Sequence, residues 1–80
     1  MTMDKAIRNR ILELCRTQDY TIHKLAKVSK IASSTLQDFI SERNNNIQMR
    51  TLLKICVGLE MSIYDFFNTD EFRYLEQEIR

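Results

Sequence analysis

The sequence contains no proline and a single glycine, Gly58, in 80 residues. Because tight turns between strands depend on these two residue types, the chain can build few of them. Hydrophobic residues make up 44% of the chain and charged residues 29%, a composition that supports a packed core. A chain of this length buries one core. We therefore expect one all-α domain rather than a sheet or a disordered segment.

Apolar residues at helical spacing divide the first half of the chain into three predicted helices. The first covers residues 4–17. Its apolar stripe leaves three basic residues outside: Arg8, Arg10 and Arg16. Thr21 caps a second helix over residues 22–29, and a third follows over residues 33–41. The predicted inward positions of these two short helices are Leu25, Ala26, Val28, Leu36, Phe39 and Ile40.

A polar run over residues 42–46 predicts a loop, because asparagine supports turns and weakens helix interiors. A fourth helix follows this loop and continues through residue 59. Its apolar positions keep helical spacing and are Met49, Leu52, Ile55, Cys56 and Leu59.

The C-terminal part of the chain predicts two further short helices. Ser62 and Asp65 resemble a capping box for the fifth, and the sixth begins at Thr69. The apolar side of the sixth helix is formed by Phe72, Leu75 and Ile79. We expect residues 1–68 to form the domain and residues 69–80 to form a C-terminal helical extension, a candidate dimer contact.

Charge is unevenly distributed along the chain. Residues 1–30 carry seven Lys or Arg and three Asp or Glu, a net charge of +4, whereas residues 51–80 carry three and six, a net charge of −3. Such an asymmetry suits a protein that turns one face to a polyanion. An uneven distribution by chance in a small chain is the alternative.

The sequence offers no support for catalysis, a cofactor or a metal. It has one histidine, His23, and no paired nucleophile and base, phosphate-binding glycine loop or metal-ligand spacing. Cys15 and Cys56 lie on apolar stripes and suggest core packing rather than a disulfide or zinc framework. No apolar run of about 18 residues is present to span a bilayer. We expect a cytoplasmic protein that is not an enzyme.

The most informative segment is the pair of short helices from Ile22 to Ser41, whose brief joining turn requires a close crossing. Ala26 is small enough to permit that crossing. The wedge between the two helices is filled by Leu25, Ile31, Leu36 and Phe39. The stretch TIHKLAKVSKIASSTLQDFI, followed by LLKICVGLEMSIYDFF, resembles the helix-turn-helix of the phage repressor and Cro type, also called the XRE family. The resemblance implies a five-helix repressor-like domain, here with a short additional C-terminal helix.

In that family the third helix enters the major groove of duplex DNA. The resemblance implies that the base-facing residues are Ser33, Ser34, Gln37 and Asp38. It implies phosphate contacts from Thr21, Ile22, His23, Ser41, Arg43 and Asn44. An amide such as Gln37 can pair with adenine, and a carboxylate such as Asp38 can accept from a cytosine amino group. Among the phosphate candidates, Arg43 is the strongest.

Two departures from the family pattern concern the turn. Lys30 lies where the family usually has glycine. Either it adopts a left-handed backbone, at a cost of about 1 kcal/mol relative to glycine, or the second helix runs on. Ala32 lies at the usual hydroxyl cap of the third helix, so Ser33 is the next candidate cap and would shift the start by one residue.

Two further departures concern contacts within the domain and to DNA. Ile22 stands where many members have a glutamine that bridges phosphate and recognition helix, and isoleucine cannot make that bridge. Cys15 and Ile40 stand where members often have a buried arginine and glutamate. An apolar contact can replace such an ion pair without loss of stability.

The resemblance implies a sequence-specific regulator of transcription, most simply a repressor, that binds double-stranded DNA as a homodimer. The alternative is a protein-interaction module of the same fold, antitoxin-like or antirepressor-like, that does not bind DNA. Ile22, Lys30 and the weakly charged third helix favour this alternative.

Overall fold

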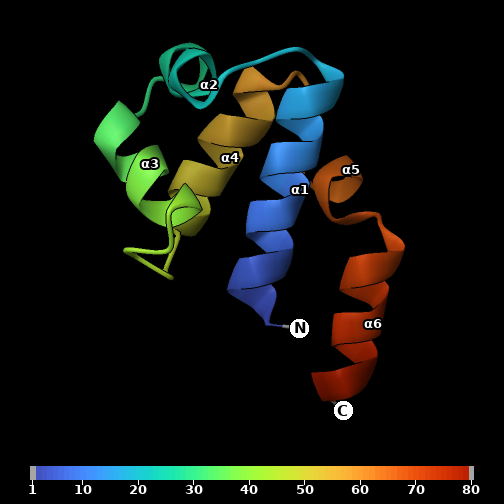
Figure 1. The fold of residues 1–80 in the computed structure, drawn as a ribbon. Coiled ribbons are helices and arrows are strands. Elements are labelled where there is room, and N and C mark those ends of the chain that lie inside the picture. The colour runs from blue at the N-terminus through green and yellow to red at the C-terminus, as the bar shows by residue number, and fades with distance from the viewer. Residues whose placement is uncertain (1, 80) are drawn as a thin grey trace.

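The computed structural model describes the backbone of residues 2–79 and the side chains of residues 2–76. This part of the chain is helical, without strands, as the sequence predicts. The six helices are α1 (Met3–Thr17), α2 (Ile22–Ser29), α3 (Ser33–Ile40), α4 (Met49–Gly58), α5 (Ile63–Phe67) and α6 (Asp70–Ile79). In Figure 1, α3 and α6 lie on opposite sides of α1, and both chain ends lie at the same end of the molecule.

One hydrophobic core joins all six helices. Ile11, Leu25, Ile55 and Phe66 are each 0% exposed and come from α1, α2, α4 and α5. Of the residues in the wedge between α2 and α3, Ile31 packs against the core and four are fully buried: Leu25, Ala26, Leu36 and Phe39. The predicted caps are present, because the hydroxyls of Thr21 and Ser62 accept from the backbone amides of Lys24 and Asp65, each at 3.0 Å.

The turn between α2 and α3 is closed by Lys30, which has a left-handed backbone (φ 58°, ψ 44°). Of the two alternatives for this position, the structure has the left-handed turn, and α2 ends at Ser29. The amide of Ile31 returns to the carbonyl of Ala26 at 3.1 Å, which satisfies a free carbonyl at the helix end. Ala32 is the N-cap of α3 and makes no side-chain cap bond. The expected cap at Ser33 and its shift of the helix start are therefore wrong.

Three predicted side-chain orientations are also wrong. Val28 and Met49 are 39% and 60% exposed, whereas Arg8 is only 5% exposed. Ser29 is buried in place of Val28, because α4 crosses α2 at Gly58. A Cβ atom on Gly58 would overlap the Ser29 hydroxyl and lie 3.2 Å from the Cα of Ser29, so a larger residue at this crossing requires Ser29 to shift.

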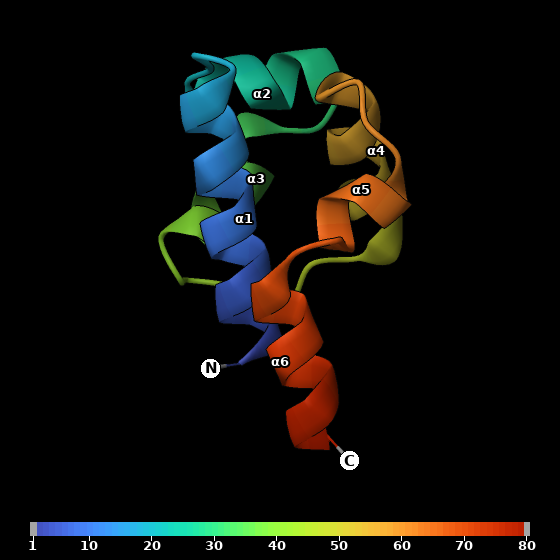
Figure 2. The same ribbon diagram turned by 90° about the vertical axis from the view of Figure 1, so that its right-hand side faces the viewer.

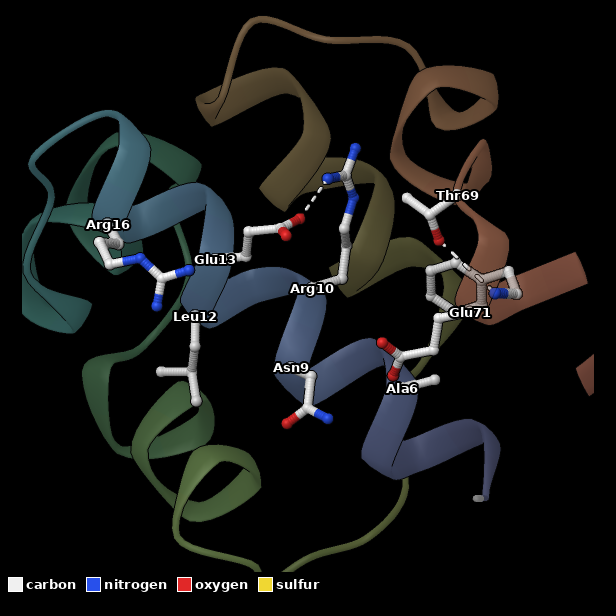
Figure 3. A pocket seen from close by; sticks show the side chains of 9 residues that line it. Ala6, Asn9, Arg10, Leu12, Glu13, Arg16, Thr69 and Glu71 are labelled. Atoms are coloured by element: carbon white, nitrogen blue, oxygen red, sulfur yellow. Dashed lines mark hydrogen bonds and ion pairs between the residues drawn. The ribbon is translucent and has the colours of Figure 1, made fainter. Parts of the chain in front are cut away.

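Helix α6 packs on α1 and α5, as Figure 2 shows. Phe72 and Leu75 are buried, and the ring of Phe72 lies 4.7 Å from that of Phe67. The apolar side that the sequence offers to a partner chain is thus covered by the same chain at these two residues, while the side chain of Ile79 lies outside the described residues. Beside this contact is an open polar cleft of about 500 Å³ between α1 and the start of α6, shown in Figure 3.

Candidate nucleic-acid interface

The exposed side of α3 presents hydrogen-bonding groups, of which only the Asp38 carboxylate is charged. Ser34 and Gln37 are exposed, Asp38 is half-exposed and Ser33 is partly buried. All four lie in the first six residues of α3, on the side of the molecule away from α6 (Figure 1). They are held there by Leu36 and Phe39, which anchor the opposite side of the same helix in the core. The predicted base-facing residues therefore share one solvent-facing region.

A hydrogen bond joins the beginnings of α2 and α3. The hydroxyl of Ser33 and Nδ1 of His23 lie 3.0 Å apart. His23 is exposed, and this contact holds its ring at the start of α2 against the start of α3. It also engages the Ser33 hydroxyl, which leaves Ser34 and Gln37 as the more exposed hydrogen-bonding groups of α3.

The loop after α3 folds back onto the last turn of that helix. The backbone carbonyl of Asp38 accepts from the amides of Arg43 and Asn44 at 2.9 and 3.1 Å. The guanidinium of Arg43 lies 3.8 Å from the Asp38 carboxylate, yet the Arg43 side chain is 79% exposed. A pair this exposed contributes little stability. Arg43 therefore lies beside the exposed side of α3 with its guanidinium mostly in solvent.

The remaining predicted phosphate contacts differ in what they can offer. Thr21 uses its hydroxyl to cap α2, and Ile22 packs against the core, so Ile22 has only its backbone to present. Ser41 and Asn44 are exposed on the loop side of α3. The Asn44 side-chain oxygen accepts from the amide of Asn46 at 3.0 Å, which orders the loop.

Arg8 is the residue of this region that the sequence analysis misses. Its Nε donates to the carbonyl of Phe39 at 2.7 Å, and a terminal nitrogen donates to the side-chain oxygen of Asn45 at 3.2 Å. The other terminal nitrogen lies 3.6 Å from carboxylates of Asp4 and Glu42. This cation ties α1 to the C-terminal end of α3, where the helix dipole favours positive charge. The signal in the sequence is the Asp4–Arg8 pair at i, i+4 spacing.

Comparison with protein families decides the assignment. Residues 10–71 match the Cro/C1-type HTH DNA-binding domain. The chain belongs to this family. Comparisons with curated proteins and with solved structures give no match. Membership makes the α2–α3 pair the helix-turn-helix of a DNA-binding regulator and confirms the fold class and the family resemblance.

This Cro/C1-type domain uses part of its N-terminal positive charge internally. Arg8 is buried, and Arg10 donates to the backbone carbonyls of Phe66 and Asp65 at 2.8 and 3.0 Å. The exposed cations of α2 are Lys24 and Lys27, and Lys30 follows them in the turn. The exposed positive charge of residues 1–30 is thus smaller than the count indicates: Lys5 and Arg16 remain exposed on α1, and Lys24, Lys27 and Lys30 are exposed on the helix-turn-helix.

The two cysteines of the Cro/C1-type domain are buried free thiols, and burial raises the pKa of both Cys15 and Cys56 above the ordinary value. Cys15 is buried in the core, and Ile40 is partly buried against the core. These are the two positions where the resemblance places an ion pair in many members of the family. Within the described residues, no group of three or more His, Cys, Asp or Glu is arranged to hold a metal ion. None of the helices in residues 2–79 is long and apolar enough to cross a membrane.

Proposed function

We propose that this Cro/C1-type domain represses transcription by reading a partly palindromic DNA site as a homodimer, with α3 in the major groove. The observation that carries the proposal is the exposed hydrogen-bonding side of α3 with Arg43 beside it. A surface of this kind separates the two tasks of a DNA reader, because base edges are read by short polar groups and phosphates are held by flanking cations.

Each predicted residue receives a role in this proposal. Gln37 presents its amide to an adenine, and Asp38 accepts from a cytosine amino group. Ser34 reaches a further base edge, and Ser33 does so only by sharing its hydroxyl with His23. The phosphate contacts come from Arg43, from the loop residues Ser41 and Asn44, and from the start of α2 at Thr21, Ile22 and His23.

The proposed homodimer rests on the symmetry of a two-armed DNA site. A domain with one reading helix covers about half a helical turn of site, and pairing two copies supplies the second half-site. Tyr74, 66% exposed on α6, is available to such a pairing after Phe72 and Leu75 are used within the chain. Repression needs only occupancy of the DNA. The proposal places the protein in the cytoplasm and assigns it no catalytic role.

A second candidate is a protein-interaction module that keeps the fold without reading DNA. Helix α3 carries no Lys or Arg, and Ile22 packs against the core instead of bridging to a phosphate. These observations favour a weaker grip on DNA than a more basic reading helix would have.

Selection of bound duplexes from a random pool separates the two candidates. Purified protein is equilibrated with the pool, and any enriched duplex is titrated at two salt concentrations. The proposal expects a two-armed motif and an affinity that falls steeply with salt, because phosphate contacts release counterions. An unenriched pool with negligible binding at low salt would contradict it and favour the interaction module.

A further inference from the structure

An open groove of about 500 Å³ runs between the C-terminal end of α2 and one side of α4. Its lining is mostly apolar and consists of Val28, Ser29, Lys30, Arg50, Leu53, Lys54 and Val57. The four residues from α4 follow i, i+3, i+4 and i+7 spacing and so form one side of that helix. Over two helical turns this side is about 10 Å long.

The apolar side chains of the groove are unusually exposed. Val57 is 75% exposed, Leu53 45% and Val28 39%. Other exposed apolar side chains, such as Leu12 and Tyr64, lie outside this groove, whereas three such side chains around one groove indicate a contact surface. Val28 is therefore a groove residue and not a core residue.

The charges around the groove all have one sign. Lys30, Arg50 and Lys54 line it, and no Asp or Glu does. Within the described residues, none of these three cations forms an ion pair. A ligand that fits must therefore combine apolar groups for the floor with negative groups for the rim.

These features select among the occupants of the groove. A second copy placed on it by two-fold symmetry would bring Arg50 and Lys54 against their own counterparts. A DNA backbone would satisfy the cations but would leave the exposed side chains of Val28, Leu53 and Val57 without apolar contact. An acidic amphipathic segment satisfies both parts.

We propose that this groove binds about two turns of an acidic amphipathic helix from a partner protein. Leucine-like side chains of the partner lie between Val28 and Val57, and its carboxylates lie over Lys30, Arg50 and Lys54. The mode is that of a helix in a groove, with anchors at i, i+3, i+4 and i+7. The contact does not use the exposed side of α3, although Lys30 is also one of the exposed cations of the helix-turn-helix.

The probe is a labelled helical peptide of about 14 residues with leucines at i, i+3, i+4 and i+7 and glutamates on its other faces. Its control is the same peptide with lysine in place of glutamate. Binding to the full chain is followed by fluorescence anisotropy. We expect the glutamate peptide to bind at least tenfold more tightly than the lysine peptide. Equal affinities, or no binding of the glutamate peptide up to millimolar protein, would overturn the proposal.

Variants locate the binding. Lys54→Glu and Val57→Ser each alter an exposed groove residue, and each should weaken binding of the glutamate peptide at least tenfold. Lys27→Glu makes the same charge change on α2 outside the groove and should alter the affinity less than twofold. Equal losses from Lys27→Glu and Lys54→Glu would reduce the contact to general charge attraction and overturn the site. Displacement of the peptide by duplex DNA would assign the groove to the DNA interface instead, and duplex binding measured in the same solutions reports separately on the proposed function.

Discussion

Lys30 is one of four described non-glycine residues with a left-handed backbone; the others are Asp19, Glu42 and Glu60. Lys30 has φ 58° at the end of α2, where a Cβ atom crowds the following carbonyl. We expect Lys30→Gly to raise the free energy of unfolding by about 1 kcal/mol, because glycine adopts this conformation without that crowding. Urea unfolding of the two proteins measures the difference.

The control for this change is Lys27→Gly, at an exposed position inside α2. Glycine there should lower the free energy of unfolding by about 1 kcal/mol, since helix interiors disfavour it. If both substitutions destabilise the chain equally, the left-handed turn carries no strain that glycine relieves.

Individual residues were predictable from the sequence where their partners are local. The caps at Thr21 and Ser62 bond to amides three residues away, so a short pattern suffices to find them. Arg8 was not found, because its main partner, the carbonyl of Phe39, lies 31 residues away and belongs to the backbone. A backbone acceptor leaves no residue type in the sequence that would mark it.

Among the contacts between helices, the hydrogen bond from Arg8 to the carbonyl of Phe39 links α1 to the C-terminal end of α3. Arg8→Met keeps the apolar stem but leaves the carbonyl of Phe39 and the side-chain oxygen of Asn45 without their donor. We expect a loss of about 1–3 kcal/mol in the free energy of unfolding, the usual range when a buried hydrogen-bonding group loses its partner. Thermal and urea unfolding measure it.

A positioning role for Arg8 predicts more than lost stability. At a temperature where Arg8→Met is fully folded, hydrogen exchange should be faster at the amides of residues 41–46 and unchanged in α5. Arg8→Lys should restore part of the stability but less of the protection, because an ammonium group cannot match the planar fork of the guanidinium. Uniformly faster exchange over all helices would show general destabilisation instead.

The crossing of α2 and α4 depends on Gly58. In an ordinary helix Gly→Ala is stabilising by up to about 1 kcal/mol. Here the new Cβ would overlap the Ser29 hydroxyl and crowd the Ser29 backbone, so Gly58→Ala should destabilise the chain by about 1–3 kcal/mol despite that gain. In a Ser29→Ala background the loss should be smaller by at least about 0.5 kcal/mol, because one of the crowded atoms is gone. Additive effects in the double variant would place the strain elsewhere.

The number and order of helices were predictable because apolar periodicity is a local property. The side of each helix that is buried was less predictable. Val28 fits the apolar stripe of α2, but α4 crosses α2 at Ser29 and leaves Val28 exposed. Met49 fits the stripe of α4, but it is the first residue of that helix and is exposed as well. In the candidate site, the family motif was enough to predict the positions of Gln37 and Arg43. The Ser33–His23 contact was not predictable, because it depends on the angle between two helices.

At the scale of the whole molecule, two buried thiols make the free energy of unfolding depend on pH in the alkaline range. Burial raises the pKa of Cys15 and Cys56 above 9.0 in the folded chain. Their contribution to stability is complete below pH 9, and it falls as the pH rises from there, because thiols of the unfolded chain ionise first. We expect the free energy of unfolding to decline between pH 9 and pH 10, and urea unfolding across this interval measures the slope.

The comparison for the alkaline slope is the Cys56→Ala variant. It should be less stable at pH 7, because alanine leaves a small void, but its stability should decline less steeply above pH 9. Identical slopes in the two proteins would assign the alkaline loss to other groups.

In the proposed function, α3 reads the bases of DNA while Arg43 binds the phosphate backbone. The most direct test of this assignment is selection of duplexes from a random pool by the parent chain, Gln37→Ala and Arg43→Ala, with affinities for the parent motif. For Gln37→Ala we expect loss of preference at one position of each half-site, worth about 1–3 kcal/mol, with the rest of the motif retained. For Arg43→Ala we expect the full motif, weaker binding to every duplex and a shallower salt dependence. An unchanged motif for Gln37→Ala, or equal losses from both variants on all sequences, would contradict the assignment of α3 to base reading.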